Sequence, residues 1–349
     1  MRIPVTLLLC LFAGHLLAQS AGEDKPLLDI SISAFAMNLP EDSREQQTRQ
    51  IYPAVRQAEA RYLPSFLKLM LEESGEWGAV RLLPDADTGA EVQIAATILD
   101  SDGNTLSLAL QAIDATGRTW IDKTYIRQAL DSVSLNQPVL TDPFLYLYTD
   151  IGNDLAAFYA TLTAAEVNEI RAVATLRYAA TLAPDVFEPY LTLAETGRYG
   201  YSRLPAENDP FLLRVQAIRD HEYVFIDVVD EQYESFFVAI KPVYDLWRKY
   251  RREQMASEAD KINREAAQGN DFRRGSYMSL RESYNNYRWS RMQDQYLEEL
   301  NEGFINEIQP TDITLEDSLY HLSGTLAEQY AEWLDILQEL YELDGPVAP

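Results

Sequence analysis

Val92-Gln-Ile-Ala-Ala-Thr-Ile-Leu99, Leu106-Ser-Leu-Ala-Leu-Gln-Ala-Ile113 and Thr119-Trp-Ile-Asp-Lys-Thr-Tyr-Ile126 are three consecutive runs in which apolar and polar side chains alternate. Alternation at period two is typical of β-strands that bury one face. The turn-like segments Asp102-Gly103-Asn104 and Asp114-Ala-Thr-Gly117 separate the runs, and they supply the Gly and Asn residues that positive φ in a hairpin turn requires. We therefore expect a three-stranded antiparallel meander.

Shorter elements before the meander complete a small α/β unit. Residues 29–35 alternate in the same way and predict a strand with one exposed face, and residues 79–83 predict a second strand. Between them a polar, helix-compatible stretch leads to Pro64, where we expect a helix to restart, and an apolar stripe then ends at Gly75. The sequence predicts an α/β domain over residues 28–128 with a mainly antiparallel sheet.

Beyond residue 128 the apolar spacing changes to three and four, which indicates helices. Thr163-Ala-Ala-Glu166 is a capping box that should open a helix running to Leu182, and Asn208-Asp-Pro210 should open a longer one. Thr314-Leu-Glu-Asp317 should begin the last helix. We expect residues 129–349 to form a larger all-α helical domain, so that the whole chain has an α+β fold.

The first twenty residues predict a secretory signal peptide. Arg2 precedes an apolar run from Ile3 to Ala18, and this run is shorter than the roughly 20 residues that a bilayer-spanning helix needs. Small residues at Ala18 and Ser20 suit a signal peptidase, so the mature chain should begin near Ala21. No later apolar run approaches spanning length, and we expect a periplasmic protein without a membrane span.

Cysteine usage agrees with a bacterial periplasm. Cys10 is the single cysteine and lies inside the signal peptide. Leu9 precedes it where a lipid-attachment signal has a small residue, so we expect no lipidation at Cys10. The mature chain then has neither disulfides nor a thiolate metal site, whereas a eukaryotic secretory route would favour disulfides.

The formal charge of −26 is unevenly distributed. Residues 241–291 contain 12 Lys and Arg against 7 Asp and Glu, whereas residues 292–349 contain 14 Asp and Glu and no Lys or Arg. A strongly acidic chain repels nucleic acids and anionic lipid surfaces. We expect no nucleic-acid partner, and any surface for anions should lie within residues 241–291.

The order strand, helix, strand and meander over Leu28–Ile126, directly after a signal peptide, resembles the small periplasmic α/β domains of the TolB amino-terminal region, CsgG and LpoB. The resemblance includes the strand over Val92–Ile98 and a following strand, Leu106–Ile113, that ends in Asp114-Ala-Thr-Gly117. It implies a protein-binding domain of an envelope machine, since that family works through contacts. Members of that family are often lipoproteins, whereas we expect no lipidation of this chain.

Catalytic motifs are scarce in the mature sequence. His221 and His321 are 100 residues apart and fit no metal-ligand spacing, and neither a nucleophile elbow nor a Gly-rich phosphate loop occurs. We therefore expect no cofactor and no metal. The run Asp100-Ser-Asp102-Gly103-Asn104 imitates part of a calcium loop and is better explained as a hairpin turn.

Carboxylates alone would suffice for glycoside hydrolysis, which needs one pair of them. Asp227, Asp230, Glu231 and Glu234 cluster near aromatic residues, with Asp227, Glu231 and Glu234 on one helical face. The alternative interpretation is a solvated acidic face, which we favour because the chain contains 55 acidic residues.

One basic stripe is the most specific constellation: Arg274, Tyr277, Arg281, Tyr284, Arg288 and Arg291. Their spacings of three and four place them on one face of a continuous helix. Guanidinium groups and tyrosine rings together suit phosphate, carboxylate or sugar ligands. The stripe is either a site for an anionic envelope glycan or an acidic partner, or an internal seam against the acidic last helix, and we favour the seam.

Three functions follow as hypotheses. The first is a non-enzymatic periplasmic interaction or assembly module of the bacterial cell envelope, with an envelope protein as partner. The second is a module that binds an anionic glycan through the Arg/Tyr stripe. The third is a carboxylate-dependent glycan hydrolase. The absence of catalytic constellations favours the first.

Overall fold

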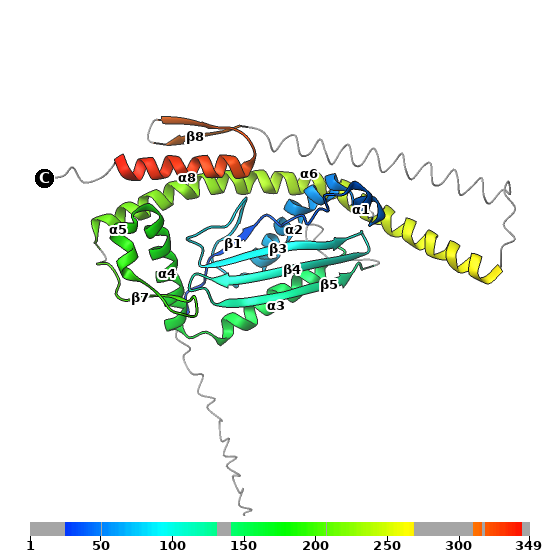
Figure 1. The fold of residues 1–349 in the computed structure, drawn as a ribbon, viewed down its shortest axis with the longest axis horizontal. Coiled ribbons are helices and arrows are strands. Elements are labelled where there is room, and N and C mark those ends of the chain that lie inside the picture. The colour runs from blue at the N-terminus through cyan, green and yellow to red at the C-terminus, as the bar shows by residue number, and fades with distance from the viewer. Residues whose placement is uncertain are drawn as a thin grey trace, which may run out of the picture.

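The structure is a computed structural model that describes residues 25–49, 51–130, 141–206, 208–268, 310–315 and 318–343 (Figure 1). Its first elements are β1 (Ile30–Ser33), α1 (Ser43–Thr48), α2 (Pro53–Ser74), β2 (Val80–Leu83), β3 (Val92–Ser101), β4 (Thr105–Asp114) and β5 (Thr119–Gln128). They are followed by α3 (Leu145–Thr161), α4 (Ala164–Leu182), α5 (Pro184–Phe187), a 3₁₀ turn (Glu188–Tyr190), β6 (Leu191–Leu193), β7 (Tyr199–Tyr201), α6 (Pro210–Gln268), β8 (Thr311–Leu315), β9 (Ser318–Leu322) and α8 (Leu326–Leu343). The chain has the α+β fold that the sequence predicts.

The main sheet has the strand order β2-β1-β3-β4-β5 among the described residues. β1 is parallel to both β2 and β3, whereas β3, β4 and β5 form the predicted antiparallel meander with the longer ladders. Gly103 and Gly117 have φ values of 87° and 81°, which confirms the two turns. The meander was predictable because its strands pair with sequence neighbours through short turns.

β1 differs from its sequence-based prediction. It lies between β2 and β3, and its polar position Ser31 is buried instead of facing solvent. The loop between β2 and β3 folds over this position, where Ser31 Oγ donates to Asp87 Oδ2 (3.4 Å). Because this contact joins residues distant in sequence, the alternation alone did not reveal that both faces of β1 are covered.

The meander buries one face and leaves the other open. α2 and α3 lie behind the sheet in the view of Figure 1, and the apolar side chains of Val92, Ile94 and Ile98 are fully buried on that side. The other face carries small and polar side chains, of which Ala95 and Gln111 are exposed. Over much of its area the sheet therefore forms one layer, and the helices behind it form the second.

α2 runs without interruption from Pro53 to Ser74, so the predicted restart of a helix at Pro64 is wrong. A proline inside a helix removes the N–H that would bond the carbonyl four residues earlier. Here that carbonyl, Ala60 O, accepts a hydrogen bond from the backbone N–H of Phe35 (2.8 Å). The strand-to-helix segment after β1 thus satisfies the acceptor that Pro64 leaves open.

The helical region contains β-structure, so the prediction of an all-α domain over residues 129–349 needs correction. β6 pairs with β7 and β8 pairs with β9, each pair forming a two-stranded antiparallel hairpin. The helices themselves agree with the sequence where capping signals are local. α4 begins at the predicted capping box of Thr163 and Glu166 and ends at Leu182, and α6 begins at Pro210.

The capping box of the last helix lies eleven residues later than predicted. Thr314 lies in β8, and α8 starts at Leu326. The box that opens α8 is Thr325-Leu-Ala-Glu328, in which Glu328 N donates to Thr325 Oγ1 (3.3 Å) and Thr325 N donates to Glu328 Oε2 (2.8 Å). The segments that begin at Thr314 and Thr325 therefore have the same capping pattern. Only the second opens a helix, because the first pairs with β9 in a hairpin.

The buried apolar side chains of the described residues form one cluster that crosses the predicted boundary at residue 128. Ile94 of the sheet, Val173 of α4, Phe225 of α6 and Trp333 of α8 all belong to it. The division into domains at residue 128 stays a prediction, and in the whole chain the core of residues 28–128 is continuous with that of the helices.

No helix within the described ranges is long and apolar enough to cross a membrane. The predicted signal peptide, residues 1–20 with Cys10, lies outside the described residues, so it stays a prediction.

Candidate binding site

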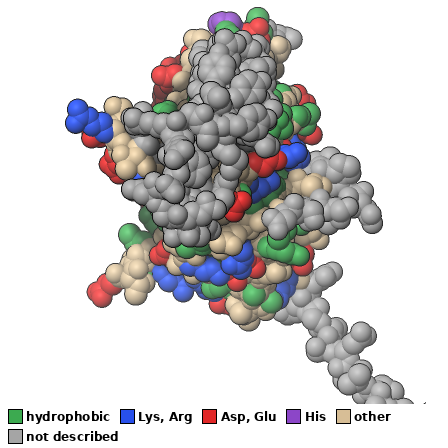
Figure 2. Space-filling view, turned by 90° about the vertical axis from the view of Figure 1, so that its right-hand side faces the viewer, with side chains coloured by type: hydrophobic (Ala, Val, Ile, Leu, Met, Phe, Trp, Pro, Cys, Tyr) green, Lys and Arg blue, Asp and Glu red, His purple; other side chains and the backbone are tan. Residues whose placement is uncertain are grey.

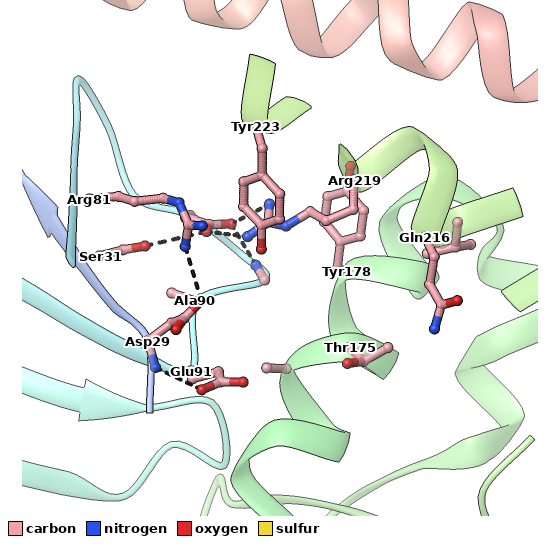
Figure 3. A pocket seen from close by; sticks show the side chains of 14 residues that line it. Asp29, Ser31, Arg81, Ala90, Glu91, Thr175, Tyr178, Gln216, Arg219 and Tyr223 are labelled. Atoms are coloured by element: carbon pink, nitrogen blue, oxygen red, sulfur yellow. Dashed lines mark hydrogen bonds and ion pairs between the residues drawn. The ribbon is translucent and has the colours of Figure 1, made fainter. Parts of the chain in front are cut away.

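A cavity of about 140 Å³ lies where the amino ends of the parallel strands meet α4 and α6 (Figure 3). Its lining combines acidic, basic, hydroxyl and aromatic side chains, and neither histidine nor cysteine is among them. The polar and aromatic residues of the lining are Asp29, Ser31, Arg81, Asp87, Glu91, Thr175, Tyr178, Gln216, Arg219 and Tyr223. We call this space the charged cavity.

Parallel pairing brings two carboxylates to the same edge of the sheet. Asp29 immediately precedes β1 and Glu91 immediately precedes β3, and these strands run side by side in the same direction. Asp29 N donates to Glu91 Oε2 (2.8 Å), which fixes the Glu91 side chain beside the start of β1. Arg81 of β2 pairs in register with Ser31 and reaches Asp29 Oδ2 through Nη1 (3.0 Å).

Two arginines stack on one tyrosine at the wall between the sheet and α6. The guanidinium carbon of Arg81 lies 4.2 Å from the ring centre of Tyr223, and that of Arg219 lies 4.8 Å from the same ring. Arg219 also lies 4.5 Å from the ring centre of Tyr178 on α4. Cation–π contacts of this kind hold the guanidinium groups in fixed planes. The cavity wall is therefore preorganised.

Arg219 joins α6 to the loop between β2 and β3. It donates to both carboxylate oxygens of Asp87, with distances of 3.1 Å and 2.5 Å, and Nη1 also donates to Glu222 Oε2 (2.8 Å). The side chains of Asp87 and Glu222 are almost completely buried. Burial opposes the charge on Arg219, but the two carboxylates outweigh it and raise the pKa of Arg219 above its usual range.

Glu91 is a partly buried carboxylate of the charged cavity with Arg171 as its cationic partner. Burial raises its pKa, while the hydrogen bond from Asp29 N and the charge of Arg171, whose Nε lies 3.1 Å from Oε1, lower it only in part. A carboxylate in this state gains from a further cationic partner. The site is therefore suited to a ligand that brings positive charge to Glu91.

A second cavity of about 250 Å³ lies on the other side of Asp87 and Tyr178, against α8. Tyr330 Oη donates to Glu222 Oε1 (2.8 Å) at its wall. Burial first, and then the charge of Glu222, raise the pKa values of Tyr178 and Tyr330 above the usual range. Both tyrosines are therefore neutral at ordinary pH.

The acidic cluster predicted on α6 divides between two environments. Asp227, Glu231 and Glu234 are exposed, which agrees with the interpretation as a solvated face. Asp230 points instead toward β2, where its Oδ1 accepts a hydrogen bond from Leu82 N (3.1 Å) and lies 3.8 Å from Lys68 Nζ. Burial raises the pKa of Asp230 to about 6. Asp230 and Glu234 line one cavity of about 130 Å³, whereas Asp227 and Glu231 are not part of its lining, so the four carboxylates do not face one space.

Two further sequence signals have structural explanations. His321 lies in β9 and not in the last helix, and its Nδ1 lies 2.6 Å from Oδ1 of the cross-strand residue Asp312, at an exposed position. Asp102 accepts hydrogen bonds from the backbone N–H groups of Asn104 (2.8 Å) and Thr105 (2.7 Å), as expected for a hairpin turn. Within the described ranges, no group of three or more His, Cys, Asp or Glu side chains is arranged to hold a metal ion.

The predicted Arg/Tyr stripe, from Arg274 to Arg291, lies outside the described residues. Its role as a ligand site or as an internal seam therefore stays a prediction. The acidic helix that we expected as its counterpart begins at Leu326 and is shorter than predicted.

The charged cavity itself was missed by sequence reasoning. Asp87 and Arg219 are 132 residues apart, and each looked like an ordinary residue of a turn or of a helix face. The turn-rich segment around Asp87 was the one local signal, because a long polar connection next to buried strands is a common place for binding residues.

No family model, no curated protein and no solved structure matches the chain.

Proposed function

We propose that this protein is a non-enzymatic interaction or assembly module of the bacterial cell envelope, exported to the periplasm, with an envelope protein as its partner. The observation that carries the proposal is the length and placement of α6. The helix has 59 residues, which corresponds to roughly 90 Å at the usual rise per residue. In Figure 1 it crosses the whole body and its last part extends past the end of the sheet.

Buried polar contacts fix α6 to the body near the point where it leaves. Tyr244 Oη donates to Glu59 Oε1 (2.7 Å), and Arg248 Nη2 donates to Asp142 Oδ2 (2.7 Å), with the side chains of Arg248 and Asp142 completely buried. Arg252 Nη1 then donates to the carbonyl oxygen of Gly103 at the tip of the first hairpin (3.1 Å). An arm held at its base in this way presents its far end in a defined direction.

Beyond Arg252 the character of the helix changes. Most side chains between Glu253 and Asp260 are exposed, whereas Trp247, Arg248 and Arg251 are buried. An isolated helical segment without tertiary packing is marginal in water, so an exposed extension gains stability when a partner covers it. This favours a protein-binding role for the segment that we call the α6 arm, residues 253–260.

The surface at this end of the molecule favours a protein partner over a polyanion. In the coloured part of Figure 2, which looks at this end, Lys and Arg side chains lie next to Asp and Glu side chains, with hydrophobic side chains around them. Polyanions are attracted by a large field of one positive sign. A mixed surface suits the polar rim of a protein interface.

Site-specific photo-crosslinking in cells tests the proposal. A photoreactive amino acid replaces Glu253 or Ser257, which lie one turn apart on the arm, and as a matched control it replaces the exposed Glu195 in the β6–β7 turn. We expect one discrete adduct from both arm positions and none from the control position. The partner should be an envelope protein by mass spectrometry, and a crosslinker placed in that partner should recover this chain.

Adducts that are absent, or equal at the arm and control positions, would contradict the proposal. Export is tested on the same material by sequencing the N-terminus of the protein from the periplasmic fraction, where we expect a start near Ala21. A chain that keeps Met1 and fractionates with the cytoplasm would contradict the envelope role.

A further inference from the structure

We propose that the charged cavity binds a small zwitterion of the amino-acid type, a molecule with one ammonium and one carboxylate group. This inference goes beyond the interaction role and does not depend on it. It rests on the size of the cavity and on side chains of both signs that face the same space.

The volume sets the size of the group that the cavity can hold. At about 140 Å³ the space is comparable with the roughly 150 Å³ cavity that accommodates a benzene molecule. A ligand with about six to nine non-hydrogen atoms, the size of a small amino acid, matches such a volume. A nucleotide, an oligosaccharide or a peptide would place only part of itself there.

The carboxylates at the start of β1 and β3 provide the place for the ammonium group. Both oxygens of Glu91 are held in position, one by Asp29 N and the other by Arg171 Nε, and partial burial raises the pKa of its carboxyl in spite of these contacts. Each carboxylate oxygen has a second lone pair that can accept from a ligand. Asp29 lies beside Glu91 in Figure 3, and its oxygens accept from Ala79 N (2.8 Å) and Arg81 Nη1 (3.0 Å), so each of them also keeps a lone pair for a ligand.

Arg81 provides the place for the carboxylate group. Among the described residues the Arg81 guanidinium makes one hydrogen bond, from Nη1 to Asp29, so that Nε and Nη2 of this lining residue remain available as donors. Its plane is fixed by the stack on Tyr223, an arrangement that suits carboxylate recognition. Arg171 at the rim likewise uses Nε alone for Glu91 and is half exposed.

The balance of charge favours a zwitterion over a singly charged ion. Arg219 is already paired with Asp87 and Glu222, which leaves Asp29 and Glu91 of the lining with Arg81 and with Arg171, the partner of Glu91. A lone anion would meet the two carboxylates, and a lone cation would meet the two arginines. A ligand with both charges can place each group against its opposite, as partly buried charges require.

Isothermal titration on the mature full-length chain tests the inference with defined probes. L-Alanine, β-alanine and γ-aminobutyrate present the two groups at three spacings. Propionate and ethylamine each lack one group, and glucose and inorganic phosphate represent other ligand classes. We expect saturable binding of at least one zwitterion at one site per chain, about tenfold or more tighter than propionate or ethylamine, since each lost charge-assisted hydrogen bond weakens binding by about that factor.

A matched pair of variants locates the site. Thr175→Trp places a large side chain at the cavity, while Thr181→Trp makes the same change farther along α4, at the second cavity. Both threonines are exposed, and each hydroxyl donates to a carbonyl of the preceding turn of the helix, so the two changes have similar costs for folding. We expect Thr175→Trp to abolish binding and Thr181→Trp to keep it. Glu91→Gln, which preserves the shape of the side chain, should weaken binding by about tenfold or more.

Several outcomes would overturn the inference. These are no saturable binding by any of the three zwitterions, binding no tighter than that of propionate or ethylamine, preference for glucose or phosphate, or equal binding by Thr175→Trp and the unsubstituted chain. A circular dichroism melting curve for each variant separates a lost site from a lost fold.

Discussion

Arg219 of α6 forms a two-point ion pair with Asp87 of the β2–β3 loop, with distances of 3.1 Å from Nη1 to Oδ1 and 2.5 Å from Nη2 to Oδ2. The same guanidinium also bonds Glu222, one turn further along α6. This relationship connects the helix to the sheet at the charged cavity. One guanidinium therefore neutralises two buried carboxylates, those of Asp87 and Glu222.

Replacement of Arg219 by Met should therefore be strongly destabilising. The side chain keeps similar length, but Asp87 and Glu222 stay buried without their cation, which costs about 3–5 kcal/mol of unfolding free energy. Urea denaturation monitored by tryptophan fluorescence measures the loss. As a control, Arg127→Met removes the half-exposed pair with Asp150 and should cost less than about 1 kcal/mol. Equal losses in the two variants would refute this account of the pair.

Tyr330→Phe tests the other partner of Glu222. The change removes the hydroxyl that donates to Glu222 Oε1 (2.8 Å) and leaves a buried acceptor unsatisfied, so the unfolding free energy should fall by about 1–3 kcal/mol. Tyr341→Phe on the same helix is the matched control, because Tyr341 Oη is buried without a hydrogen-bond partner among the described residues. We expect the control to change stability little or to increase it slightly. Thermal and urea unfolding of both variants give the comparison.

Asp230 should make stability depend on pH. Burial raises its pKa from 3.8 to about 6 in the folded state, so between these values the folded chain binds more protons than the unfolded chain. Its contribution to the unfolding free energy is therefore complete below about pH 4 and is lost as the pH rises through about 6. In Asp230→Asn this dependence should disappear, while the amide oxygen can still accept from Leu82 N.

Urea denaturation at several pH values between 4 and 7 checks this sign. Relative to Asp230→Asn, the unsubstituted chain should become less stable as the pH rises. Identical pH profiles, or a difference of the opposite sign, would show that the Asp230 carboxyl is not held in the environment described.

Thr163→Ala tests the cap of α4. Thr163 Oγ1 accepts from Glu166 N (3.2 Å) and donates to Glu166 Oε2 (3.0 Å), while Thr163 N also donates to that oxygen (2.9 Å). The hydrogen bonds from Thr163, backbone first, and the one from Arg118 lower the pKa of Glu166 to about 2. Loss of the hydroxyl should reduce stability by about 1 kcal/mol and raise this pKa toward its usual range.

The pKa of Glu166 can be followed by carbon NMR, and Thr163→Ser should behave like the unsubstituted chain because it keeps the hydroxyl. An unchanged pKa in Thr163→Ala would mean that the hydroxyl does not act on Glu166.

The sequence predicted those elements whose signals are local. The three strands of the meander pair through short turns at Gly103 and Gly117, and α4 begins at a box formed by residues three apart. The predicted helix start at Pro64 was wrong because the donor that satisfies the Ala60 carbonyl, Phe35 N, comes from another element. The predicted helix start at Thr314 was wrong because Thr314 belongs to a hairpin strand. The capping box that opens α8, at Thr325, has the same sequence pattern.

By itself the sequence determined the α+β class, the meander, the start of α6 and the bounds of α4, since alternation, turn residues and caps act over a few residues. The tertiary structure decided everything at the charged cavity. Asp29, Arg81, Glu91 and Arg219 face one space because parallel strands share an edge and α6 crosses them, and such contacts between distant residues leave no periodic trace in a single chain.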